Sequence, residues 1–381
     1  MDAIDGDSHF SEPLDLFERY TDPRYRDRTV RVARSSTTGE RSLIVDGKPM
    51  ILVDVEELLG ALVGYGQKES GADLGTFDRY LIESARWQDM SERVRYLDSE
   101  GFAAQVIYPS LGLIWEGSVK DPLLADALCR AYNTWAFELC AGHADRLYPA
   151  AHISLRDASL AVRELERVAK LGCKAIFVAA APVDGKSFGH ASLDPVWAAA
   201  QDLDLAVGIH LAGHPNYTGH DWYRDEYPGF MFVTMNVIQD PRMALTTMVY
   251  DGVFERFPNL KGGVIEAGAG WAPEFLRELD LAFKSFGRTD PYLKAMTLKP
   301  SEQLRRAVKF TPFPGEDVGR MIRDGGADLF MFSSDYPHPE GTNDPLGRFE
   351  RTMEGLDEDA KDRFYRRNFE QMMGLDALVP A

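Results

Sequence analysis

An apolar run late in the sequence, residues 330–334, ends directly in an acid. Asp335 follows the run, and His338 and Glu340 lie in the segment behind it. Burying an unpaired carboxylate costs several kcal/mol or shifts its pKa, so such a group normally has a cation or a hydrogen-bond donor beside it. We therefore expect the rest of the chain to supply a partner for Asp335.

Ionisable residues also close three other apolar runs. Asp7 and His9 close the first, and because they are two positions apart in a predicted strand, their side chains leave it on one face. His210 and Glu266 close two further runs. With Asp335 they give two imidazoles and three carboxylates. This mixed nitrogen and oxygen set suits Zn²⁺, Mn²⁺ or Fe²⁺ and disfavours a metal that prefers thiolates.

Each of these residues also has a plainer interpretation. His210 alone could be a hydrogen-bonded core histidine, Glu266 could cap a helix or form a local ion pair, and Asp335 could cap the turn that follows it. The set is more informative than its members, because every one of them falls at the same end of its predicted strand.

Other polar and aromatic residues are weaker candidates. We predict that His338 orients a metal ligand rather than binding metal, since ligands usually need hydrogen-bonding partners of their own. His152, inside an apolar run, is predicted to be a hydrogen-bonded core histidine, with an extra ligand or a proton shuttle as the alternative. Some loop residues could contact substrate, although each could equally be solvated or part of the core: Trp115, His214, His220, Trp222 and Tyr223.

The elements that would position these residues alternate along the chain. Eight short apolar runs are predicted strands, and most are continuous, as expected of parallel strands buried on both faces. Helix-like segments follow most of them. This alternation predicts a (β/α)8 TIM barrel rather than an open doubly wound sheet, and barrel enzymes carry their chemistry at the carboxyl ends of the strands. The runs are 3–9, 103–108, 147–153, 173–178, 206–211, 262–266, 308–313 and 329–334.

Several predicted helices have recognisable ends. Asp157 is a predicted N-cap, and its helix should stop near Gly172. Asp121 should open another helix, Pro241 a third, and residues 271–286 should form an amphipathic helix.

Residues 22–86 interrupt the alternation. Asp46 and Gly47 lie between two β-prone runs and predict a hairpin, and a glycine-rich stretch at 60–75 follows. We interpret 22–86 as an insertion after strand one, within a single metal-dependent barrel domain spanning 1–381. It either covers the barrel rim and shapes the substrate pocket or is an edge decoration.

Composition narrows the class of protein. The 381 residues are 45% hydrophobic and 27% charged, which fits a soluble barrel enzyme with an ample core. The net charge of −18 argues against nucleic acid and anionic membranes as partners. No apolar run reaches transmembrane length, no secretory signal is visible, and three widely spaced cysteines fit reduced thiols. We expect a cytoplasmic protein that acts on a small molecule.

The sequence resembles the amidohydrolase superfamily, in particular the amidohydrolase-related branch that includes the aminocarboxymuconate-semialdehyde and hydroxybenzoate decarboxylases. The resemblance runs nearly end to end and rests on IDGDSHFSEP, GIHLAG, EAGAGWAPEFLRELD, SSDYPHPEGTNDP and RRNFEQMMGL. Asp7 and His9 stand where the family often has His-x-His or Glu-x-His, and His210 and Asp335 match its strand-five histidine and strand-eight aspartate. The resemblance implies a divalent metal that activates water or binds the substrate.

Two departures from the family pattern concern the number of metal ions. Glu266 stands where many members have a histidine, and no lysine for a carboxylated bridge is evident where the fourth run ends at Val178. One ion is therefore expected, or two if Glu266 bridges them. A set of this kind also resembles non-haem di-iron sites, and the family includes at least one such oxygenase.

The predicted function is a metal-dependent hydrolase that acts on an amide, ester, lactone or thioester through a metal-activated water. Asp335, helped by His338, would act as base and then as acid. Alternatives are a di-iron monooxygenase with a ferredoxin-type electron donor, a non-oxidative decarboxylase, and a non-catalytic metal or small-molecule binding barrel. A homodimer is possible, since family members often pair. The predicted metal ligands are Asp7, His9, His210, Glu266 and Asp335.

Overall fold

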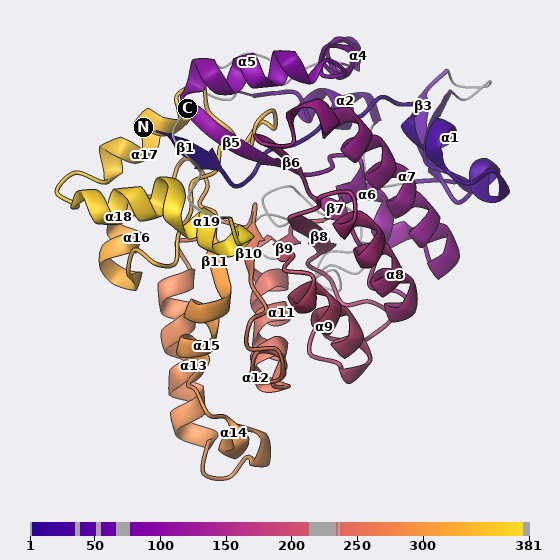
Figure 1. Cartoon of the computed structure of the whole chain (residues 1–381). Coiled ribbons are helices and arrows are strands. Elements are labelled where there is room, and N and C mark those ends of the chain that lie inside the picture. The colour runs from indigo at the N-terminus through magenta and orange to yellow at the C-terminus, as the bar shows by residue number, and fades with distance from the viewer. Residues whose placement is uncertain are drawn as a thin grey trace.

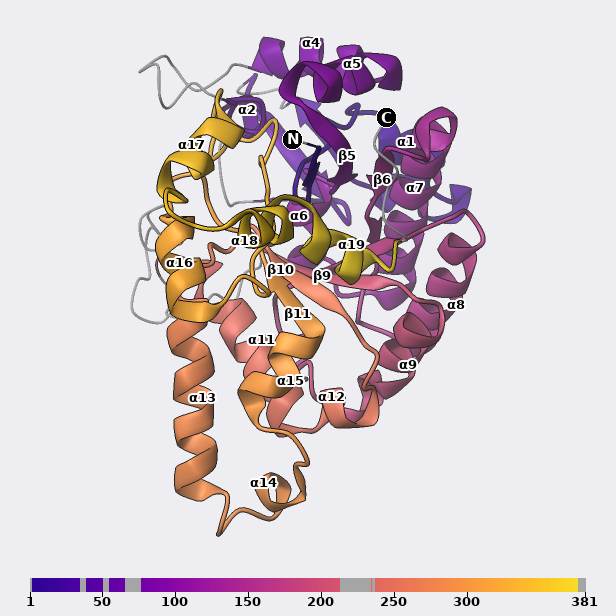
Figure 2. The same ribbon diagram turned by 60° about the vertical axis from the view of Figure 1, so that its left-hand side comes forward.

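Parallel strands form the centre of the molecule and helices surround them (Figures 1 and 2). This computed structural model describes residues 2–34, 39–50, 55–65, 77–212, 234 and 237–375. The strands are β1 (Ala3–Asp5), β2 (Arg31–Arg34), β3 (Arg41–Val45), β4 (Lys48–Pro49), β5 (Phe102–Ile107), β6 (Leu147–Pro149), β7 (Ala151–His152), β8 (Ala175–Ala179), β9 (Ala206–His210), β10 (Gly262–Ile265) and β11 (Val308–Phe310).

The central strands close into the predicted (β/α)8 barrel. One sheet has the order β1-β5-β6 and a second has the order β11-β10-β9-β8-β7. The two meet at residues 147–152, a single extended segment whose first half (β6) pairs with β5 and whose second half (β7) pairs with β8. The Ala150 N–H between the halves donates to the carbonyl of Ile107 at 2.9 Å.

The eighth predicted strand closes the barrel but is not regular. Residues 329–334 bridge β11 and β1, since the Phe310 N–H donates to Leu329 and the Gly6 N–H donates to Phe332, both at 2.9 Å. Only isolated bridges form here, at Phe330 and at Tyr336. The first predicted strand, 3–9, is likewise shorter, because regular pairing stops at Asp5 and resumes only as bridges at Ser8 and His9. Both irregularities lie where the two segments meet.

The helices follow the order that the alternation predicts. They are α1 (Leu16–Tyr20), α2 (Val55–Ala61), α4 (Phe77–Arg86), α5 (Met90–Glu100), α6 (Gly112–Trp115), α7 (Pro122–Cys140), α8 (Ala158–Ala169), α9 (Asp194–Asp202), α11 (Gln239–Tyr250), α12 (Val253–Arg256), α13 (Ala272–Phe286), α14 (Pro291–Ala295), α15 (Pro300–Ala307), α16 (Val318–Gly325), α17 (Pro345–Thr352), α18 (Glu358–Asp362) and α19 (Asn368–Met373).

The predicted helix ends are largely confirmed. The carboxylates of Asp121 and Asp157 accept backbone N–H groups of the first turns of α7 and α8. The helix expected to begin at Pro241 begins two residues earlier and is divided in two, because Gly252 adopts φ 73° between α11 and α12.

Two apolar cores flank the barrel wall. The inner core, which includes Ile4, Val106, Phe177 and Met331, fills the barrel. Met372 of α19 belongs to it and faces Gly263 near the start of β10, so α19 covers the end of the barrel at which the strands begin. The opposite end, at which the strands finish, is left for polar side chains.

Part of the 22–86 segment is described. The Asp46–Gly47 hairpin is confirmed: both residues have positive φ, 52° and 71°, between antiparallel β3 and β4. The Tyr65 N–H donates to the carbonyl of Pro337 at 3.0 Å, so the segment reaches the loop behind Asp335. That 22–86 as a whole covers the barrel rim remains a prediction. Within the described ranges, no helix has the length and apolar character needed to cross a bilayer.

Candidate metal centre

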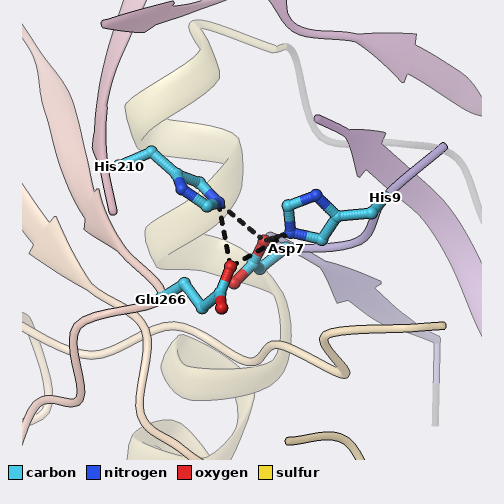
Figure 3. Close-up of side chains that lie close together, drawn as sticks. All are labelled: Asp7, His9, His210 and Glu266. Carbon is cyan, nitrogen blue, oxygen red and sulfur yellow. Dashed lines mark ion pairs between the residues drawn. The ribbon is translucent and has the colours of Figure 1, made fainter. Parts of the chain in front are cut away.

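The five predicted ligands lie together at the carboxyl ends of the strands. Asp7 and His9 follow β1, His210 is the last residue of β9, Glu266 follows β10 directly, and Asp335 follows the eighth segment. All five are buried. Four of them point toward one another in Figure 3, which shows the two imidazoles above the carboxylates of Asp7 and Glu266.

Short distances join the imidazoles to the carboxylates. The His9 Nε2 atom lies 3.4 Å from Asp7 Oδ1, 3.3 Å from Glu266 Oε2 and 3.6 Å from Asp335 Oδ1. The His210 Nε2 atom lies 3.6 Å from Asp7 Oδ1 and 3.5 Å from Glu266 Oε2. Two ligands of one tetrahedral metal, each bound at about 2.1 Å, lie about 3.4 Å apart. The observed spacing therefore fits side chains arranged around an ion.

The outer nitrogens of both histidines fix which atom faces the centre. The His9 Nδ1 atom lies 3.1 Å from the carbonyl oxygen of Pro109, and the His210 Nδ1 atom lies 2.7 Å from that of Leu211. A carbonyl only accepts, so each Nδ1 carries the proton and each Nε2 of a neutral ring presents a lone pair inward. This is the arrangement that metal-binding histidines usually adopt.

The inward atoms have no hydrogen-bond partner among the described residues. They are Asp7 Oδ1, His9 Nε2, His210 Nε2, Glu266 Oε2 and both carboxylate oxygens of Asp335. Buried polar atoms are nearly always paired, and acceptor atoms that face one another need a shared cation. The donor set thus fits a divalent metal ion. The plainer interpretations of His210, Glu266 and Asp335 do not account for these unpartnered atoms.

The electrostatics of the cluster lead to the same conclusion. Burial, together with the carboxylates of Glu266 and Asp7, raises the pKa of Asp335 well above its usual value. Burial and the neighbouring His338 lower the pKa of His9, but the close carboxylates of Asp7 and Glu266 outweigh them and raise that pKa to about 9. Without a cation the cluster therefore retains protons. A divalent ion would replace them, and its binding would release protons to solvent.

Two of the candidate ligands adopt unusual backbone conformations. Glu266 has φ 50° and Asp335 has φ 55°, in the left-handed region that residues other than glycine seldom occupy. Such strain persists only where the surrounding structure enforces it, and it gathers at functional sites. At both positions the turn aims a carboxylate into the cluster immediately after a strand.

His338 lies against the cluster from the side of Asp335. Its ring stacks on that of His9 with centroids 3.8 Å apart. Its Nε2 atom lies 2.8 Å from Ser110 Oγ, which itself lies 2.7 Å from the carbonyl oxygen of Phe10. Because the single hydroxyl proton goes to that carbonyl, His338 Nε2 must be the donor to Ser110. Its Nδ1 atom therefore faces Asp335 Oδ1, 3.4 Å away.

A family model described as amidohydrolase matches residues 107–375, well over half of the chain. This chain belongs to the amidohydrolase family. A curated relative of this amidohydrolase, the 2-amino-3-carboxymuconate-6-semialdehyde decarboxylase of Dictyostelium discoideum, is 23% identical over 77% of the chain and 79% of its own length. The gamma-resorcylate decarboxylase of a Polaromonas strain is 26% identical over 64% of the chain and 76% of its own length.

Solved structures match the whole amidohydrolase fold. An amidohydrolase from Mycobacterium avium subsp. paratuberculosis superposes with a TM-score of 0.81 and 26% identity, over 98% of this chain and 99% of that one. A dihydroxybenzoic acid decarboxylase from Polaromonas, solved with manganese and the inhibitor 2-nitroresorcinol, gives a TM-score of 0.64 and 18% identity over 98% and 97%. This likeness confirms the predicted barrel, while the family model and the two decarboxylase relatives confirm the family branch.

The weaker candidates for functional residues are not part of the cluster of candidate ligands. His152 is buried, and its Nε2 atom lies 2.8 Å from Glu116 Oε2, as expected of a hydrogen-bonded core histidine, although its Nδ1 atom has no described partner. Trp115 is buried beside it, with ring centroids 4.9 Å apart. The positions of His214, His220, Trp222 and Tyr223 lie outside the described residues.

Sequence reasoning missed several polar residues beneath the cluster. Asp5 is fully buried in β1 and holds the backbone of Asp7. Glu12 accepts the N–H groups of Ser110 and Leu111 and so fixes the loop that supports His338. A signal was available for both: each is an acid two to three residues from Asp7 or His9 in a stretch with apolar neighbours.

Proposed function

We propose that this member of the amidohydrolase family is a non-oxidative decarboxylase that depends on a divalent metal. Its substrate would be a hydroxylated aromatic carboxylic acid or a similarly unsaturated one. The hydrolase prediction from the sequence is not confirmed. The names of the relatives favour the decarboxylase alternative, and the structure related by fold was solved with manganese and a phenolic inhibitor.

The observation that carries the proposal is the position of Asp335. Its Oδ1 atom faces His9 and His338, whereas its Oδ2 atom is buried with no described partner. Asp335 therefore has an oxygen that can hold a proton beside the place where a substrate would lie. Decarboxylation needs such a proton, since the carbon that loses CO₂ must receive one.

The metal would be held by Asp7, His9, His210 and Glu266, with Asp335 beside them. When bound, a divalent ion supplies a Lewis acid that can hold a substrate carboxylate and a neighbouring hydroxyl group. The residues of the chain then account for proton transfer. The C–C bond breaks, CO₂ leaves without the bonding electrons, and the substrate carbon takes the proton of the Asp335 carboxyl. His338 Nδ1 lies within reach to return a proton to Asp335.

The test compares CO₂ release with hydrolysis. The metal-stripped protein would be loaded with Mn²⁺ and given γ-resorcylate, a panel of other hydroxybenzoates, and a panel of aryl esters and lactones. We expect loss of the carboxyl group from at least one hydroxybenzoate. Ester or lactone cleavage without any CO₂ release would instead establish the hydrolase and refute the proposal.

His338 provides a second arm of this test. His338→Asn should lower kcat by about a hundredfold, as the loss of a proton-transfer group typically does. His190→Asn, which alters an exposed histidine that belongs to neither group of candidate ligands, should leave kcat unchanged. Equal rates for the two variants would remove His338 from the proton path.

One observation favours a second candidate. The groups fall into two sets of four that share His9 and Glu266: Asp7, His9, His210 and Glu266, and His9, Glu266, Asp335 and His338. Of the two shared residues only the Glu266 carboxylate could serve two ions, because the one inward nitrogen of His9 can bind a single ion. A pair of irons bridged by Glu266 would correspond to the di-iron monooxygenase alternative. Elemental analysis of anaerobically purified protein separates the candidates: two irons per chain favour the oxygenase, and one manganese or zinc excludes it.

A further inference from the structure

The carboxylate of Asp5 receives four hydrogen bonds. Its Oδ1 atom accepts from the Asp7 N–H at 3.2 Å and from the Ser334 N–H at 2.8 Å. Its Oδ2 atom accepts from Ser334 Oγ and from Gln105 Nε2, each at 2.6 Å. Asp5 is fully buried, and every one of these contacts is a donor. The position thus requires a group with two accepting oxygens.

Asp5 takes over a hydrogen bond where the barrel closure is irregular. The Gly6 N–H donates to Phe332, and the Asp335 N–H donates to Asp7. A regular parallel ladder would send the intervening Ser334 N–H to the carbonyl of Gly6. Here that N–H goes to the Asp5 side chain instead, and the next residue, Asp335, turns to φ 55°. Asp5 therefore fixes the backbone at Ser334, directly before the turn that points the Asp335 side chain into the cluster.

Gln105 and Arg93 extend this network toward His9. The Gln105 Oε1 atom accepts from Arg93 Nε at 2.8 Å, so the amide orientation is fixed and its NH₂ group must face Asp5. Arg93 Nη2 donates to the carbonyl oxygen of His9 at 3.2 Å. The guanidinium also lies 4.7 Å from the centroid of the Tyr336 ring, on the segment behind Asp335.

We propose that Asp5 is the positioning residue that sets the metal centre. Its carboxylate joins the backbone of Asp7 to that of Ser334, and through Gln105 and Arg93 it also acts on His9. It thereby fixes the relative placement of candidate ligands that come from the first and the last strand of the barrel. This inference rests on the proposed metal site but not on the identity of the substrate.

Asp5→Asn is the direct test, since it keeps size and removes an acceptor. The new NH₂ group would meet Gln105 Nε2, a donor that cannot turn because Arg93 holds its other end. The double variant Asp5→Asn with Gln105→Glu exchanges the two groups: the new amide donates, and the new carboxylate accepts from both the amide and Arg93. A network that works through these bonds should be restored by the exchange.

The readout is Mn²⁺ binding to metal-stripped protein, measured as the loss of the free Mn²⁺ signal in electron paramagnetic resonance. We expect Asp5→Asn to raise Kd about tenfold or more, within the range usual for partners of metal ligands. The double variant should return to within about threefold of the unaltered protein. Asp280→Asn is the matched control, since Asp280 of α13 also accepts the N–H and Oγ of one serine, Ser301 of α15. Its Kd should not change.

An unchanged Kd in folded Asp5→Asn protein would overturn the inference, as would a double variant that binds no better than Asp5→Asn. Circular dichroism establishes folding beforehand. If Asp5→Asn does not fold, Ser334→Ala takes its place, because it deletes one donor to Asp5 and leaves the carboxylate. Its Kd should rise about threefold, and an unaltered Kd would equally overturn the inference. If the unaltered protein binds no Mn²⁺, the metal site itself fails, and the inference with it.

Discussion

Replacing Glu12 by glutamine should change how the stability of the protein depends on pH. Glu12 is fully buried, and its Oε1 atom accepts the Ser110 N–H at 2.8 Å and the Leu111 N–H at 3.1 Å. A glutamine oxygen can accept both. Glu12→Gln keeps these two bonds and removes the ionisation, although its new NH₂ group replaces Oε2, which lies 3.2 Å from the Leu111 N. The pH dependence of the difference between the two proteins therefore isolates the effect of the charge.

The magnitude follows from the pKa of Glu12. Burial raises this pKa from the ordinary value of 4.5 to about 7, although the backbone N–H groups oppose the rise. Each pKa unit corresponds to about 1.4 kcal/mol, so the shift is worth about 3 kcal/mol. Because the folded pKa is the higher one, the folded state holds the proton more tightly. This contribution to stability is complete below pH 4.5 and is lost as the pH rises through 7.

Urea denaturation of both proteins in EDTA, at pH 5, 6, 7 and 8, would measure the effect. The difference in free energy of unfolding, variant minus unaltered protein, should increase by about 2.5 kcal/mol from pH 5 to pH 8. The buried new amide of the variant changes the free energy of unfolding by the same amount at every pH. It therefore does not affect the change in the difference between pH 5 and pH 8. A difference that stays flat across this range would show that Glu12 ionises normally, and the reasoning from burial would be wrong.

Three further outcomes are expected. Mn²⁺ at one hundred times its Kd should stabilise metal-stripped protein by about 2.7 kcal/mol in thermal melts, and His210→Ala should abolish that gain; a gain of full size in the variant would exclude His210 as a ligand. Asp157→Ala, which removes the N-cap of α8, should cost about 1 kcal/mol in urea denaturation, and no loss would contradict the cap. Gly319→Ala should cost about 3 kcal/mol, because the added methyl group would overlap the carbonyl oxygen of Thr352; Gly142→Ala, which meets open space, is its control.

The placement of the candidate ligands was predictable from the sequence because it follows from topology. Parallel strands finish at one end of a barrel, so a polar residue at the end of each predicted strand must approach the others. Asp7, His210, Glu266 and Asp335 came together for that reason. The distances and the rotation of each imidazole were not predictable, because they depend on backbone carbonyls such as that of Pro109, in the loop after β5.

The irregular parts of the barrel could not be predicted from the sequence patterns. Residues 329–334 read as an ordinary buried strand, yet the ladder breaks at Ser334, because a side chain from β1 takes its N–H group. The left-handed turn at Glu266 was equally hidden, since nothing in the residue type favours a positive φ. In both cases a long-range contact decides the local conformation, and local propensity does not contain it.

The hydrogen bond between Asp5 and Ser334 joins residues 329 positions apart in the chain. Contacts of such long sequence separation form late in folding, and a chain that emerges from the ribosome folds its early part first. Asp7 and His9 therefore exist for most of synthesis without the partners that complete their site. The proposed metal site would lack Asp335, and Asp5 would lack its contact with Ser334, until the eighth segment has been made. If Asp5 positions the site as proposed, tight metal binding would require that nearly the whole barrel has been translated and closed, and a prematurely terminated chain would bind the metal more weakly.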